Sequence, residues 1–208
     1  MKNSPSHPCS QQIGQIIYEG IEEILGKTDS ALLFKLANFP LPDEKDGAKK
    51  SNKQLAYRNL STLLEVIDKT YGHKGGQGIA LRAGRASFKK VIRMYGQQMG
   101  FAKLDYRLLP TPARLKTGLH ALAKTFSELW EEPIRVLEDQ SAWYWQIEHS
   151  PWCWERHSEE VTCHFTVGLV QEYLSWASGG KFYNVVETMC AASGQEYCAI
   201  QISKQAIE

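Results

Sequence analysis

Along the first 130 residues, apolar side chains recur at three- and four-residue intervals, the spacing of one face of an α-helix. The stretches with this pattern lie within residues 13–25, 32–36, 55–67, 79–99 and 115–129. A turn over residues 26–30 separates the first two helices, and Thr111 and Pro112 supply N-cap and first-turn signals for the last. The segment Gly72–Gly84 contains five glycines and is predicted to be a flexible connection.

The pattern changes after residue 140. Ala142–His149 alternates between apolar and polar residues as a strand does, and a further helix follows over residues 165–174. Two β-prone runs, Tyr183–Cys190 and Glu196–Ile202, flank a turn in which Gly194 can adopt a positive φ, so a hairpin is predicted. Several helices followed by a strand, a helix and a hairpin indicate an α+β fold with a small antiparallel sheet packed on helices.

A charged, proline-containing stretch near residue 45 is the clearest linker, because it lacks periodic apolar residues. The chain therefore divides into a tail and helical extension (residues 1–42), a linker (43–53) and a ligand-binding domain (54–208). Residues 1–11 are predicted to be a mobile tail in which Cys9 has no structural role. The apolar face of the first helix is expected to cover the main domain or to form a dimer interface.

Composition excludes several classes of function. The chain has 208 residues, 43% of them apolar, and a net charge of +1, so no overall field attracts nucleic acid. Its glycines match neither nucleotide-binding pattern. Five cysteines without a signal peptide, and no apolar run of about 20 residues, predict a cytoplasmic protein that is at most peripheral to a membrane. The basic residues Arg82, Arg85, Lys89, Lys90 and Arg93 are interpreted as a solvated helix face, with partner docking as the alternative.

The last third of the chain contains a candidate metal site. The predicted hairpin brings Cys190 and Cys198 together, Cys163 stands where a helix begins, and Glu187 shortly precedes Cys190. Three sulfur atoms and one oxygen would complete a tetrahedron. The spacing is not that of a zinc finger, and three other interpretations stay open: buried free thiols, a disulfide between Cys190 and Cys198, and Glu187 as an ordinary exposed strand residue.

Residues 187–202, E-T-M-C-A-A-S-G-Q-E-Y-C-A-I-Q-I, resemble the closing signature of the 4-vinyl reductase domain family. The resemblance covers the last third well and the middle loosely, through Gly78–Arg85 and residues 108–126. It implies an α+β fold, dimerisation, and a structural zinc held by Cys163, Glu187, Cys190 and Cys198. His164 is the alternative to Glu187 as the fourth ligand.

The same resemblance implies a cavity for a hydrophobic molecule. All six tryptophans fall between residues 130 and 176, and alternation places Trp143 and Trp145 on one strand face. Plain core packing is the alternative explanation for such a face. The candidate ligand-binding residues are His120, Phe126, Trp130, Trp143, Tyr144, Trp145 and His149.

The expected function is therefore non-catalytic, with no catalytic residues assigned. The resemblance implies a photosynthesis-related factor that binds a tetrapyrrole, chlorophyll or a precursor, as a homodimer or with a related domain. One alternative is a vinyl reductase of chlorophyll biosynthesis, in which Cys153 joins the other three cysteines around an Fe-S cluster. A second alternative is a protein-interaction module.

Overall fold

The structure, a computed structural model, describes residues 7–40 and 55–207. The helices in these ranges are α1 (Gln11–Leu36), α2 (Tyr57–Tyr71), α3 (His73–Tyr95), α4 (Leu104–Leu108), α5 (Thr111–Trp130) and α6 (His164–Ser178). The strands are β1 (Ile134–Glu138), β2 (Ala142–Ile147), β3 (Phe182–Met189) and β4 (Cys198–Ile207). The predicted linker, residues 43–53, lies outside the described residues, and the division into three parts stays a prediction.

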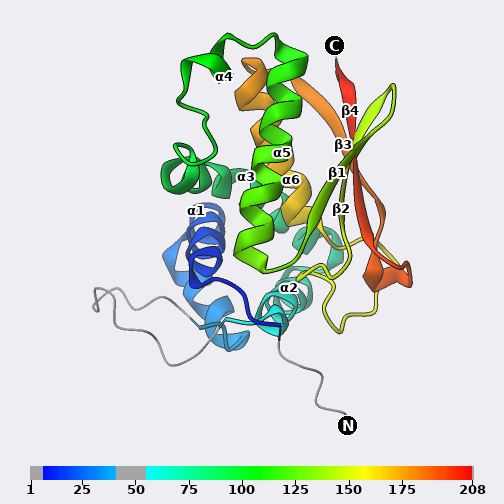
Figure 1. The fold of residues 1–208 in the computed structure, drawn as a ribbon. Coiled ribbons are helices and arrows are strands. Elements are labelled where there is room, and N and C mark those ends of the chain that lie inside the picture. The colour runs from blue at the N-terminus through cyan, green and yellow to red at the C-terminus, as the bar shows by residue number, and fades with distance from the viewer. Residues whose placement is uncertain (1–6, 41–54, 208) are drawn as a thin grey trace.

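The strands form one antiparallel sheet in the order β1-β2-β4-β3. Helices α5 and α6 lie against one face of this sheet, with α1 to α3 beyond them (Figure 1). On the covered face, Trp143 pairs with Ile202 and Trp145 with Ile200, and all four side chains are buried. The α+β fold with an antiparallel sheet on helices is thus confirmed.

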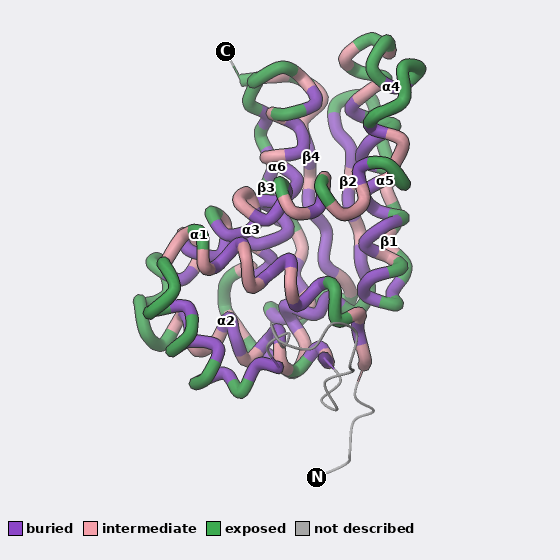
Figure 2. The backbone as a smooth tube through the Cα atoms, turned by 90° about the vertical axis from the view of Figure 1, so that its left-hand side faces the viewer, coloured by how far each residue is buried: buried purple, intermediate pink, exposed green. Residues whose placement is uncertain are grey.

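Buried residues form one connected core that joins the sheet to the helices, and Figure 2 shows this in purple. Its centre is aromatic: Phe126 and Trp130 of α5, Trp145 of β2, Trp152 of the following loop and Phe165 of α6 are each at most 1% exposed. Their rings pack mostly edge to face, as for Trp130 and Trp152 at 6.3 Å and 88°. In the described part of the chain, no helix combines the length and apolar character needed to cross a membrane.

Helix α3 runs through the glycine-rich segment, so the prediction of a flexible connection is wrong for residues 73–84. The glycines allow a close helix contact. A Cβ atom on Gly84 would lie 2.0 Å from the carbonyl oxygen of Phe165, and one on Gly168 would lie 2.0 Å from that of Leu81. Close packing of α3 on α6 therefore offsets the cost of about 1 kcal/mol that glycine carries in a helix.

Residues 7–11 pack against the rest of the molecule, which corrects the prediction of a mobile tail for this part, while residues 1–6 lie outside the described residues. Cys9 is 4% exposed and lies in the core, and its backbone N–H donates to the Leu55 carbonyl at 2.9 Å. The prediction that Cys9 has no structural role is therefore wrong. Helix α1 breaks at Gly26 (φ 78°), where the sequence predicts a turn.

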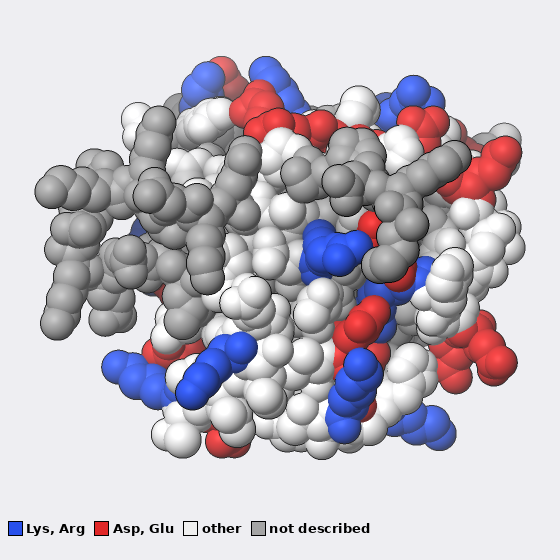
Figure 3. Space-filling model, turned by 90° about the horizontal axis from the view of Figure 1, so that it is seen from below, with Lys and Arg blue, Asp and Glu red and all other residues white. Residues whose placement is uncertain are grey.

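Most of the basic cluster on α3 is neutralised by other helices. Arg85 pairs with Glu172 of α6, Lys89 with Glu23 of α1, and Lys90 with Glu19. On the face seen in Figure 3, basic and acidic side chains likewise lie side by side rather than in patches of one sign. Because three of its five basic residues form ion pairs, the cluster is not a concentration of unpaired positive charge. Its interpretation as a solvated helix face stays a prediction.

Candidate metal centre

Four short segments converge at one end of the sheet, and each supplies one cysteine. Cys153 lies in the loop that follows β2, Cys163 directly precedes α6, Cys190 follows β3, and Cys198 begins β4. The turn between Cys190 and Cys198 uses Gly194 at φ 90°, as the sequence predicts. All four thiols are free and buried.

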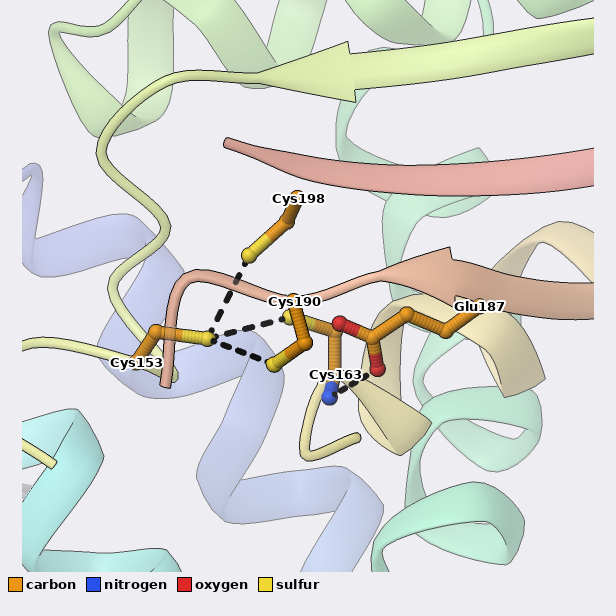
Figure 4. A group of neighbouring side chains, drawn as sticks. All are labelled: Cys153, Cys163, Glu187, Cys190 and Cys198. Atoms are coloured by element: carbon orange, nitrogen blue, oxygen red, sulfur yellow. Dashed lines mark hydrogen bonds between the residues drawn. The ribbon is translucent and has the colours of Figure 1, made fainter. Parts of the chain in front are cut away.

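Cys153 stands at the centre of this group, as Figure 4 shows. Its Sγ lies 3.5 Å from the Sγ of Cys163, 3.5 Å from that of Cys190 and 3.3 Å from that of Cys198. Around a metal ion with bonds of about 2.3 Å to sulfur, the corners of a tetrahedron are about 3.8 Å apart. The distances from Cys153 Sγ are about 0.3 to 0.5 Å shorter than this, and all four sulfur atoms lie within 4.8 Å of one another, so a small outward movement of the thiols would place them around a single tetrahedral ion.

Glu187 is the fifth member of the group, and the ligand atoms of all five residues lie within 4.8 Å of one another. One carboxylate oxygen, Oε2, accepts a hydrogen bond from the backbone N–H of Cys163 at 2.7 Å. The other, Oε1, is buried and has no hydrogen-bond partner among the described residues. Burial raises the pKa of this carboxyl to about 9. An unpartnered oxygen beside four thiols favours a cation at this place.

Burial also raises the pKa of the Cys163 thiol well above its ordinary value. A hydrogen bond with Cys163 has the opposite effect on Cys153 and lowers its pKa to about 7. Hydrogen bonds with Cys153, Cys163 and Cys198 lower the pKa of Cys190 still further below its ordinary value, so Cys190 is the thiol that most readily becomes a thiolate, the form that binds metals. Hydrogen-bonding groups around the cluster can also stabilise thiolates. The backbone N–H of Ala191 donates to Cys198 Sγ at 3.3 Å, and the Thr162 hydroxyl lies 3.2 Å from Cys153 Sγ.

The loop between β2 and α6 is fastened at several points, which fixes Cys153 and Cys163. Trp152 donates through Nε1 to Thr166 Oγ1 at 2.9 Å, and Arg156 donates through Nη2 to Asp68 Oδ2 of α2 at 2.9 Å. The Ser158 N–H donates to the carbonyl of Ala192, in the turn between Cys190 and Cys198, at 2.9 Å. Folding of this loop therefore brings the thiols together.

The structure thus assembles the predicted set Cys163, Glu187, Cys190 and Cys198 and adds Cys153, which the sequence analysis included only in the Fe-S alternative. His164 lies outside the group of five; its Nε2 is buried without a partner in the described chain, and burial lowers its pKa.

The predicted ligand-pocket residues do not converge on one cavity. Phe126, Trp130, Trp143 and Trp145 are buried in the core. Tyr144 donates its hydroxyl hydrogen to Asp139 at 2.7 Å, and His149 Nδ1 lies 2.9 Å from Glu132 Oε1. Of the seven predicted residues, only His120 lines an open cleft, which has a volume of about 590 Å³ and lies between α5 and β1.

No protein-family model matches the sequence, and no curated protein matches it either. Solved structures do match over nearly the whole chain. An H-NOX protein from S. oneidensis in the Fe(II)NO state has a TM-score of 0.62 and 12% identity, with 96% of this chain and 99% of that chain covered. The chain has the H-NOX fold.

Two further solved structures of H-NOX proteins are similar to this chain over nearly its whole length. An oxygen-binding H-NOX domain related to soluble guanylate cyclases, in its oxygen complex, has a TM-score of 0.58 and 14% identity, covering 94% of this chain and 95% of that one. The Fe(II) unliganded H-NOX protein from K. algicida has a TM-score of 0.58 and 12% identity, with coverages of 94% and 96%.

These structures overturn the resemblance to the 4-vinyl reductase domain family, which is wrong. The function that it implied, a photosynthesis-related tetrapyrrole factor or a vinyl reductase, is wrong for the same reason. So is the set of cofactors that it implied, namely structural zinc, a chlorophyll-type tetrapyrrole or an Fe-S cluster. The structures of this fold are instead described by their Fe(II), NO and oxygen states and, in one case, by the redox potential of haem.

The described residues do not fit haem. A haem needs an axial ligand such as histidine and a slot that encloses most of the porphyrin. Among the histidines in the described part, His164 has a buried Nε2 but lines a space of only about 10 Å³, and the aromatic core is filled by its own side chains. The cleft beside His120 is open and is lined by three carboxylates, Glu128, Glu131 and Glu132, which repel the propionates of haem.

Titration of the purified protein with ferric haem is therefore expected to give no saturable complex. Absorption in the Soret region measures this directly. The His120→Ala variant, which removes the one imidazole on the cleft, is expected to behave as the wild type does. A stoichiometric haem complex that disappears in His120→Ala would contradict this prediction and place haem in the α5/β1 cleft.

Proposed function

We propose that this chain is a non-catalytic, metal-binding domain of the H-NOX fold. A thiophilic metal ion binds Cys153, Cys163, Cys190 and Cys198 and fastens the β3–β4 turn, the start of α6 and the loop after β2 to one another. The observation that carries the proposal is the position of Cys153 Sγ, 3.3 to 3.5 Å from the three other sulfur atoms. Thiolate donors in a tetrahedral arrangement select soft metal ions.

The donor set also supports a structural role. Four protein ligands leave no open position for a substrate or a reactive water molecule. Glu187 accepts a hydrogen bond from the backbone N–H of Cys163 and so orients that ligand. Dimerisation, membrane association and cytoplasmic localisation remain predictions.

Elemental analysis of the purified protein, followed by replacement of the ion with Co²⁺, tests the proposal. We expect one equivalent of metal per chain and, after replacement, a sulfur-to-cobalt charge-transfer band with the intensity of a site that has four thiolates. Protein that contains no metal and shows no such band with Co²⁺ would contradict the proposal.

A further inference from the structure

A cleft of about 340 Å³ lies at the end of α6 remote from the cysteines, between that helix, α4 and the start of α5. It is lined by Phe101, Tyr106, Arg107, Arg114, Trp176 and Ala177. Trp176 lies 13 residues beyond Cys163, or about 20 Å along a helix. In Figure 1 the α4 end of the molecule is accordingly far from the turn between β3 and β4. The cleft is thus separate from the candidate metal centre.

One wall of the cleft is aromatic. Phe101 is buried and stacks on Tyr106, with ring centroids 4.9 Å apart, and it lies 5.3 Å from the ring of Trp176. Trp176 is 45% exposed, whereas the five other tryptophans are buried or half-buried. An exposed indole that continues a buried aromatic stack provides a face on which a flat ring can pack.

The other wall carries two guanidinium groups that have no acidic partner. No ion pair in the described chain includes Arg107 or Arg114, and the first turn of α5 contains no acidic residue. Arg114 Nε is buried without a hydrogen-bond partner. Its other nitrogens make only long contacts of 3.4 Å, to the Arg107 carbonyl and to Thr111 Oγ1. By contrast, Arg85 on α3 pairs with Glu172.

We propose that this cleft binds a small aromatic carboxylate. The ring packs against Trp176 and Phe101, and the carboxylate accepts hydrogen bonds from Arg107 and Arg114. A guanidinium group matches a carboxylate with two parallel hydrogen bonds, and such a ligand would give the terminal nitrogens of Arg114 a charged acceptor in place of their long contacts of 3.4 Å. The volume, about 340 Å³, is at the lower end of the range for small-molecule sites, which favours a ligand of one or two rings. The site is independent of the proposed metal centre.

Calorimetric titration of the full chain with indole-3-acetate tests the proposal, with indole-3-acetamide as the uncharged probe of the same shape and acetate as the charged probe without a ring. We expect indole-3-acetate to bind at one site and each of the other two to bind at least about tenfold more weakly, because a hydrogen-bonded charge contributes more than 1.4 kcal/mol. Equal binding of the amide, equal binding of acetate, or no binding of indole-3-acetate would each overturn the proposal.

Variants locate the site. Arg114→Met is expected to weaken binding of indole-3-acetate at least about tenfold. Arg107→Gln, at an exposed position of α4, is expected to weaken it too, and it provides the test if Arg114→Met does not fold. The matched control is Arg82→Met on α3, outside the cleft, which should bind as the wild type does. Unchanged affinity in both Arg107→Gln and Arg114→Met, or in Arg107→Gln when it alone folds, would contradict the assignment.

Discussion

Serine at position 153 is expected to release the bound metal and to lower the melting temperature by about 10 °C. Cys153 Sγ lies close to all three other sulfur atoms, so its loss removes one of the four ligands and leaves the ion with an incomplete set. Because metal binding contributes to folding free energy, a loss of about 4 kcal/mol is expected, and each 1 kcal/mol shifts the melting temperature of a domain of this size by about 2–4 °C. Elemental analysis and thermal unfolding of Cys153→Ser measure both effects.

A comparison with Glu187→Gln distinguishes the two possible ligand sets. If the four sulfur atoms bind the ion, Glu187→Gln keeps the metal, because the glutamine carbonyl oxygen can still accept the hydrogen bond from the Cys163 N–H. If the set predicted from the sequence binds it, Glu187→Gln loses the metal and Cys153→Ser keeps it. Cys9→Ala is the control: Cys9 is buried but lies outside the cluster, so the variant should lose some stability and no metal.

The predicted and observed sites differ at Cys153 for a physical reason. Cys163, Glu187, Cys190 and Cys198 belong to a helix start and a hairpin, whose geometry follows from local turn and spacing rules. Cys153 lies in an irregular loop whose path depends on distant partners, such as the pairing of Arg156 with Asp68 on α2. No pattern in the sequence around Cys153 encodes that contact.

Contacts between residues that are far apart in the sequence also explain why helix α3 was predicted incorrectly. Helix α3 contains four glycines and is bordered by a glycine at each end, so local propensity disfavours a helix there. The helix forms because Gly84 meets α6, a contact between residues that are far apart in the sequence. Strand β1 was not predicted, since it has only five residues, none of them is buried, and Leu137 interrupts the alternation of apolar and polar residues.

The resemblance to the 4-vinyl reductase domain family rests chiefly on residues 187–202, which form the turn of one hairpin and the adjoining ends of its two strands. Turn chemistry and ligand spacing constrain those residues strongly, and similar constraints can arise in different families. The likeness to H-NOX structures spans 94 to 96% of this chain and so includes the helices of residues 11–130, which contribute only apolar periodicity to the sequence pattern. Three-dimensional comparison therefore identified a fold that the hairpin signature did not.

Alanine at position 84 is expected to destabilise the protein by about 2–3 kcal/mol, because a buried methyl group would force α3 away from α6. Its Cβ would meet backbone atoms, the Phe165 oxygen at 2.0 Å and the Leu169 nitrogen at 3.0 Å, which cannot rotate aside. Urea unfolding measures the change. Since Phe165 follows Cys163 by two residues, the displacement of α6 should also weaken metal binding.

Gly78→Ala is the matched control, in the same helix. A Cβ atom on Gly78 would have nothing within 4 Å, so alanine should stabilise the protein by up to about 1 kcal/mol through its higher helix propensity. If Gly84→Ala also stabilises the protein, the close contact of α3 with α6 is not present in solution. If it destabilises the protein and leaves metal affinity unchanged, α6 moves without displacing Cys163, and the four-thiolate centre is held mainly by the loop after β2 and by the hairpin.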